Sequence, residues 1–211
     1  MAISLPYPYP QLDTEDNKWD SFALLRNLQF LAERIDAVIS VNAIAVAIRS
    51  VGNPITTVVS TAAETTIFST TVLGGTFGTN HGLQLVISGD VLNNTGAGRG
   101  FILRLKYGGT TFATFDSSGA LASNATRRGW QAVTNLSANN SVSNQFSFGE
   151  CRVSNTGVSG TSVSVASNLQ STHNALAINS AISQTLAVTI QPEVNSASLS
   201  IRPFSIAGLL M

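Results

Sequence analysis

The sequence contains few ionisable side chains. Asp, Glu, Lys and Arg make up 10% of its 211 residues, whereas an ordinary soluble domain has about 25%. Six of the eleven acidic residues lie within the first 36 positions, so the rest of the chain is nearly free of charge. The hydrophobic fraction is 44%, which is too high for a disordered chain. Ser, Thr, Asn and Gly replace the missing charges, and this composition is typical of β-sheets with hydroxyls and amides on their outer faces.

Other absences exclude several classes of protein. The single cysteine, Cys151, excludes an intrachain disulfide framework. His81 and His173 have no Cys, His, Asp or Glu at ligand spacing, so we expect neither a metal site nor a cofactor. No apolar run reaches the roughly 18 residues of a membrane span, and the first residues lack the pattern of a secretory signal, so neither is expected. Seven basic and five acidic residues beyond position 50 are dispersed, which argues against nucleic-acid binding.

The first 19 residues alternate proline with tyrosine over Leu5–Pro10. Each proline fixes its own φ and favours an extended conformation in the preceding residue. We therefore predict that residues 1–19 form an extended arm that docks on a partner, because prolines lower the ordering cost of docking. The alternative is a frayed terminus. The predicted anchor residues are Pro6, Tyr7, Pro8, Tyr9 and Trp19.

Residues 20–51 show helical periodicity, with Asp20 or Ser21 as the cap of the first turn. Apolar residues recur at alternating spacings of four and three, which is the pattern of a coiled-coil seam. We predict a mainly helical stem that forms a homotrimer; the alternative is one amphipathic helix packed on its own β domain. Residues 43–51 also alternate with period two, so the end of the helix is open there. The predicted trimerisation residues are Leu24, Leu28, Leu31, Ile35, Val38 and Asn42.

From residue 52 onward the sequence consists of short alternating segments separated by polar turns. Gly52-Asn53-Pro54 marks the boundary. The pattern predicts a mainly β fold in which residues 52–211 form an antiparallel β-sandwich, most simply a jelly roll. The predicted strands are 55–61, 64–72, 83–88, 100–107, 110–116, 129–136, 145–153, 161–166, 184–191 and 197–206.

No group of residues forms a recognisable catalytic motif, so we do not expect an enzyme. Cys151 has no base beside it in sequence and is interpreted as a small core residue. Gly96–Gly100 superficially matches a phosphate-binding loop, but a strand follows it, and we interpret it as a hairpin turn. Trp130 is interpreted as a core residue, although with Arg127 and Arg128 it could also grip an anionic or sugar ligand. No pair stands out among the five acids Glu64, Asp90, Asp116, Glu150 and Glu193.

Several segments resemble one family. Glu64–Ser69, Leu92–Arg99 and Arg104–Thr110 resemble the β-sandwich modules of tailed-bacteriophage fibre and capsid-decoration proteins. The proline-tyrosine arm and the Leu24–Val38 seam resemble the attachment ends of such proteins. The resemblance rests on turn sequences and implies a homotrimeric component of the virion surface, docked on capsid or tail proteins by its N-terminus. It supplies no catalytic residues.

The same family suggests two roles, which the sequence leaves open. A decoration protein stabilises the shell and needs no ligand, whereas a tail-associated fibre recognises a host receptor or glycan. A free carbohydrate-binding or carbohydrate-cleaving domain is a third alternative. Loops on a rigid sandwich usually carry recognition, so we expect any ligand to contact the loops around 93–99, 117–128 and 155–160. The candidate contact residues are Asn93, Asn94, Arg99, Arg127 and Arg128.

Overall fold

The computed structural model describes residues 12–13, 18–19, 28–29, 48–51, 55–154 and 166–211. The chain divides into two compact units, Met1–Ala45 and Val46–Met211, and each is described by itself. None of the described helices is long and apolar enough to cross a membrane.

In the N-terminal unit, the described residues form one pair of short antiparallel strands and one helical segment of two residues. β1 (Leu12–Asp13) pairs antiparallel with β2 (Lys18–Trp19), and Leu12 lies opposite Trp19. Antiparallel pairing requires the chain to reverse direction, so the predicted arm is not extended throughout. Leu28 and Gln29 are helical, and the Leu28 side chain is exposed. The described residues contain no other helix, so they do not support the predicted coiled-coil stem. The other predicted anchor and seam residues lie outside the described residues: Pro6, Tyr7, Pro8, Tyr9, Leu24, Leu31, Ile35, Val38 and Asn42.

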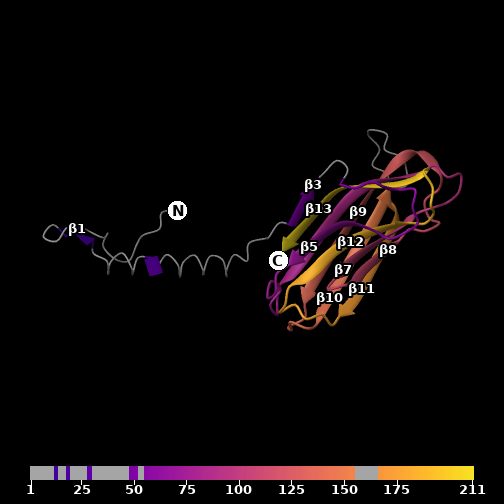
Figure 1. Ribbon diagram of the computed structural model, residues 1–211. Helices are drawn as coiled ribbons and strands as arrows, with labels where there is room; N and C mark the ends of the chain where they lie inside the picture. The colour runs from indigo at the N-terminus through magenta and orange to yellow at the C-terminus, as the bar shows by residue number, and fades with distance from the viewer. Residues whose placement is uncertain (1–11, 14–17, 20–27, 30–47, 52–54, 155–165) are drawn as a thin grey trace. The chain divides into compact units, whose positions relative to one another are not determined.

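The second unit contains two antiparallel sheets (Figure 1). The larger has seven strands. Six follow one another in the order β11 (Ala166–Leu176), β10 (Gln145–Ser154), β9 (Asn124–Ala138), β6 (Gly82–Asn93), β13 (Leu199–Leu210) and β3 (Ile48–Val51), and β4 (Val58–Val59) also pairs with β13. The smaller has the order β5 (Thr65–Val72), β12 (Gln184–Pro192), β7 (Phe101–Tyr107) and β8 (Thr110–Asp116).

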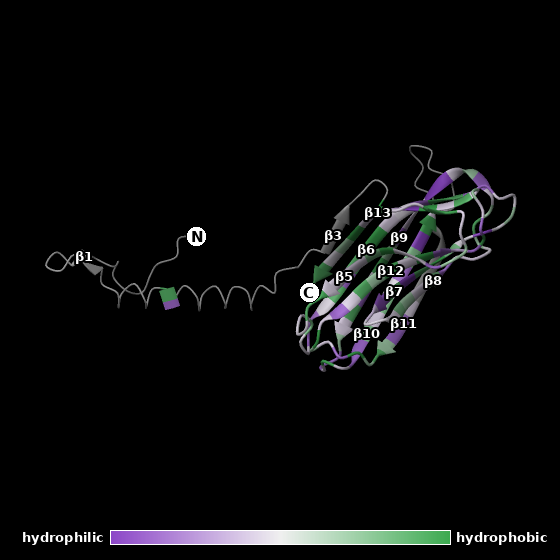
Figure 2. Cartoon of the chain, in the orientation of Figure 1, coloured by the Kyte–Doolittle hydropathy of each residue, from purple (hydrophilic) through white to green (hydrophobic). Residues whose placement is uncertain are grey.

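Alternating side chains place the core between the two sheets. In β7, Phe101, Leu103, Leu105 and Tyr107 are buried while the residues between them are partly exposed, because successive side chains of a strand point to opposite faces. Strands of both sheets contribute to one continuous hydrophobic cluster. Figure 2 shows the resulting mixture of hydrophobic and hydrophilic positions along the strands. The predicted mainly β, antiparallel sandwich is confirmed.

Two segments differ from the sequence-based expectation. Ile48–Val51 form strand β3, paired with β13 from Gly208 to Ser205, so the β domain begins before residue 52 and these residues are not helical. The period-two alternation of apolar and other residues over 43–51 is therefore the pattern of a strand at Ile48–Val51 and not of a helix. The predicted strand at 161–166 lies outside the described residues except for Ala166, and the actual strand β11 continues to Leu176 through a polar stretch with no apolar alternation.

Candidate functional site

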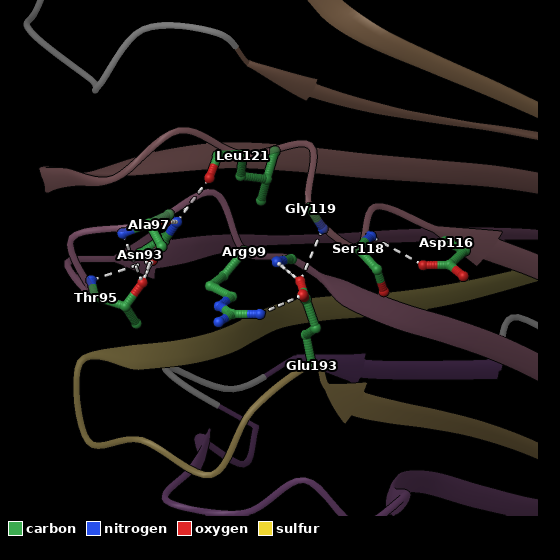
Figure 3. A network of polar contacts seen from close by, with 10 residues as sticks. Asn93, Thr95, Ala97, Arg99, Asp116, Ser118, Gly119, Leu121 and Glu193 are labelled. Atoms are coloured by element: carbon green, nitrogen blue, oxygen red, sulfur yellow. Dashed lines mark hydrogen bonds and ion pairs between the residues drawn. The ribbon is translucent and has the colours of Figure 1, made fainter.

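One end of the sandwich is braced by a single carboxylate. Glu193 follows β12, and its Oε2 accepts hydrogen bonds of 2.8 Å from the backbone N–H groups of Gly100 and Gly119. Its Oε1 forms a 2.8 Å ion pair with Arg99 (Figure 3). Gly100 and Arg99 belong to the β6–β7 connection and Gly119 to the β8–β9 connection. One side chain therefore ties three loops together.

The ionised form of Glu193 is the form that makes these contacts. Burial by itself raises the pKa of this carboxyl, but the hydrogen bonds from Gly119, Arg99 and Gly100 outweigh burial. The pKa of Glu193 is therefore lower than its ordinary value of 4.5. An anion with these partners is a structural tie and not a proton donor at neutral pH.

Asn93 braces the same end from the last position of β6. Its Nδ2 donates to the carbonyl oxygens of Ala97 at 2.9 Å and Leu121 at 2.6 Å. Its Oδ1 accepts from the Thr95 backbone N–H and hydroxyl. Figure 3 shows this second set of contacts beside the Glu193 set. The Asn93 side chain thus closes the loop that follows it, and only 5% of the residue is exposed.

The β6–β7 connection is not the hairpin turn that the glycine-rich sequence suggested. β6 belongs to the larger sheet and β7 to the smaller one, so Gly96–Gly100 crosses between the sheets. Gly100 lies so close to the β8–β9 loop that an added Cβ would be 1.9 Å from the Ser117 carbonyl oxygen. The glycines allow two segments of the chain to cross closely. The backbone N–H of Gly100 donates to the Glu193 carboxylate of the same chain.

A second charged group lies on the outer face of the larger sheet. Asp90 of β6 pairs with Arg127 at 2.7 Å and accepts from Arg202 Nε at 2.9 Å. Arg127 also contacts Ser200, and the Arg202 guanidinium lies 5.6 Å from the centre of the Phe204 ring. Two basic groups converge on one acid that is 8% exposed, so this group fixes β6, β9 and β13 together.

The predicted ligand-contact residues do lie at the braced end. Most of them, however, are in a strand or make contacts within the domain, and are not free side chains of exposed loops. Arg127 and Arg128 lie in strand β9 and not in a loop. Arg128 is buried and donates to the Ala122 carbonyl oxygen. Asn94 is exposed, and its backbone N–H donates to Ser198 at 2.8 Å. Asn93, Arg99 and Arg127 make the internal contacts described above.

The outer face of the smaller sheet is polar. Glu64 contacts Lys106, Arg104 and the Thr189 hydroxyl. The hydrogen bond from Lys106 is the largest of the effects that lower the pKa of Glu64. Arg104 also donates to Gln191 at 2.8 Å. These side chains pair their charges and hydrogen-bonding groups with one another across β7 and β12. They form a network of ion pairs and hydrogen bonds on the surface of the sheet.

The groups that could do covalent or metal chemistry do not converge in the described part of the chain. Cys151 is buried, as the sequence predicted, and burial raises the pKa of its thiol to about 12. Trp130 is also a core residue, with its ring 5.4 Å from that of Phe101. Within the described ranges, no three His, Cys, Asp or Glu residues are grouped as metal ligands. His173 packs on the Phe146 ring at 4.7 Å.

The opposite end of the sandwich has a different surface, which the sequence reasoning missed. It is defined by six exposed apolar side chains, and we call it the apolar end: Leu73, Phe146, Phe148, Ile182, Leu209 and Met211. A pocket of about 210 Å³ opens there between the ends of β5 and β13 and the start of β6, lined by Val72, Leu73, Phe77, Leu83 and Leu210 together with three threonines. The hydropathy colouring shows the end of β13 as hydrophobic beside the C-terminus (Figure 2).

The described residues thus define an antiparallel β-sandwich domain with a braced, charged end and an apolar end. No family model matches the chain, and no curated protein matches it. Among solved structures, a partial match is to a chain in the structure of infectious bursal disease virus, Gx strain, with 13% identity over 79% of this chain. This chain spans 40% of that chain, with a TM-score of 0.24, which is too low to establish a shared fold.

Proposed function

We propose that the chain is a structural, non-enzymatic component of a tailed-bacteriophage particle. In this proposal it is a short homotrimeric fibre or capsid-decoration protein on the particle surface. The arm of residues 1–19 docks on a capsid or tail protein, the heptad-bearing segment joins three copies, and the β-sandwich faces outward. Three weakly docked copies then act together, because tethered sites gain effective concentration without new contacts.

The connectivity of the sandwich supports this proposal at the level of architecture. β12 lies between β5 and β7 in the smaller sheet, and β13 lies between β6 and β3 in the larger sheet. The last strands of the chain are thus inserted between early ones, which is the connectivity of a jelly roll. This fold occurs in viral capsid proteins and also in unrelated proteins. The fold therefore agrees with a particle component without selecting one.

The observation that carries the proposal is that acidic side chains of the domain form ion pairs with basic side chains of the same domain. Glu64, Asp90, Glu150 and Glu193 are each paired with a basic side chain of the same domain. In the described part of the domain, these contacts tie loops and strands to one another. A rigid domain of this kind, preceded by a proline-tyrosine segment and a heptad seam, is suited to being mounted on a larger assembly.

Deleting residues 1–19 tests the docking role. We expect the truncated protein to be absent from purified particles, because the arm is the proposed contact with the particle, while the β domain keeps its melting temperature. The measurement is mass spectrometry of particles made with the full-length or the truncated chain. A matched variant, Tyr7→Ser with Tyr9→Ser, separates loss of the aromatic contacts from loss of chain length. Normal incorporation of the truncated chain would refute the arm as an anchor.

A second candidate is a tail-associated fibre that recognises a host receptor or glycan. The exposure of Asn94 and of the neighbouring residues Gly96, Ala97 and Gly98 favours it, because these residues lie on a rigidly braced loop. Electron microscopy of labelled particles separates the two roles. Regular positions on the capsid lattice support decoration, and positions on the tail or baseplate support adsorption.

A further inference from the structure

The apolar end differs from the rest of the domain in charge as well as in exposure. Its connecting segments, residues 73–81, 108–109, 139–144 and 177–183, contain no Asp, Glu, Lys or Arg. The braced end, in contrast, holds Arg99 and Glu193. Loop tips exposed to water are normally polar and charged, whereas the centres of protein interfaces lack charge and are rich in aromatic residues and Met. The apolar end has the composition of an interface.

Two of the exposed apolar residues of this end, Phe148 and Leu209, lie at the two ends of one row across the outer face of the larger sheet. Phe148 of β10 lies opposite Asn135 of β9, Asn135 lies opposite Gln84 of β6, and Gln84 lies opposite Leu209 of β13. The two amides in the middle bond to each other at 3.1 Å, so they satisfy part of their own hydrogen-bonding capacity. The row therefore contains no charged side chain, and it ends in Phe148 at 54% exposure and Leu209 at 43%.

The point where the chain enters the domain indicates what covers this surface. β3 starts at Ile48, opposite Gly208, which lies next to Leu209. β3 thus begins at the apolar end, and the predicted trimerisation seam precedes it in the sequence. If three chains are joined through that seam, the three β domains are held at a high local concentration.

We propose that the apolar end is the surface through which the β domains of neighbouring copies of this chain pack on one another. This inference rests on the self-association in the proposed function and names its site in the domain. An uncharged face needs no complementary charge, so it fits a second copy of itself. The pocket beside Leu73 and Leu210 is lined by apolar side chains and can receive an apolar side chain of the neighbouring copy.

The test compares two substitutions in the full-length chain. Leu209→Lys introduces charge at the apolar end, and Val59→Lys makes the same change at a position of similar exposure, 39% against 43%. Val59 pairs with Ser200, about 30 Å along β13 from Leu209. We expect Leu209→Lys to raise the concentration of half-dissociation at least about tenfold, and Val59→Lys to leave it unchanged, in a dilution series followed by sedimentation. Phe148→Lys is a second probe of the same row.

The possible outcomes separate this inference from the proposed function. If the wild-type chain associates and neither Leu209→Lys nor Phe148→Lys weakens it, the apolar end is not the interface, while the proposed function stands. Equal weakening by Val59→Lys would also overturn the inference, because the effect would then be one of charge in general. A wild-type chain that is monomeric at every concentration would overturn both. Melting curves verify that each variant is folded.

Discussion

At the scale of single residues, the polar side chains of this domain act as ties between segments that are distant in sequence. Glu193 and Asn93 are the clearest cases. Each makes contacts with two or more loops through both of its side-chain polar atoms. A buried or half-buried carboxylate that accepts several hydrogen bonds is stabilising only while it is ionised. The braced end should therefore respond to substitution and to acid.

We expect Glu193→Gln to lower the free energy of unfolding by about 1–3 kcal/mol at neutral pH, because hydrogen bonds to a charged group are lost. The folded-state pKa of Glu193 is lowered, so its stabilisation is present above 4.5 and is lost as the pH falls through the folded value. The difference between wild type and variant should thus shrink in acid. Urea unfolding at a series of pH values measures it.

Glu150→Gln is the matched control for this prediction. Glu150 pairs with Arg152 at 2.8 Å, but the two side chains are 34% and 58% exposed. An exposed pair contributes about 0–1 kcal/mol. Equal losses in the two variants, or a difference that stays constant from neutral to acidic pH, would contradict the bracing role of Glu193.

At the scale of elements, alternation and turn residues were sufficient to predict most strands but not their pairing. The burial of Phe101–Tyr107 alternates because one face is in the core, and Gly108-Gly109 forms the hairpin to β8. The glycines of Gly96–Gly100 gave the same signal, yet they connect two sheets. Turn residues indicate that the chain changes direction, but they do not indicate whether the next strand pairs with the preceding one. β11 was missed because its polar sequence lacks a buried-face pattern.

Close packing of β6 on β13 depends on a missing side chain. An added Cβ on Gly89 would lie 2.4 Å from the Arg202 carbonyl oxygen and 2.8 Å from the Trp130 ring. The β13 register shifts nearby, between Pro203 and Ser205. We expect Gly89→Ala to lower the free energy of unfolding by about 1–3 kcal/mol, because the backbone of β13 and the Trp130 indole must move away from the added methyl group. Thermal unfolding measures the loss.

Gly129→Ala provides the comparison for Gly89→Ala. Gly129 lies on β9 opposite Asp90, one position from the partner of Gly89, and an added Cβ there would meet no atom within 4 Å. We expect little change in stability at this position. A loss as large as that of Gly89→Ala would show that strand glycines matter for their backbone freedom and not for the space they leave.

At the scale of the whole molecule, the sequence predicted the sandwich but not its two unlike ends. Residues of the braced end, such as Asn93 and Glu193, are 100 positions apart, and only the pairing of strands brings them together. The apolar residues Leu73 and Ile182 each look ordinary in their local sequence. Their common location depends on topology, which single-residue patterns do not contain.

Self-association through the heptad seam is the prediction on which the molecular proposal depends most. Leu31 occupies an inward position of the seam, whereas Ala37 lies on the outer side of the same predicted helix. We expect Leu31→Asp to lower the oligomeric mass across a micromolar dilution series, because it places a charge between apolar side chains, and Ala37→Asp to leave the mass unchanged. Light scattering coupled to size-exclusion chromatography measures both. A Leu31→Asp chain with the wild-type mass at every concentration would show that the copies, if they associate, do so without this seam.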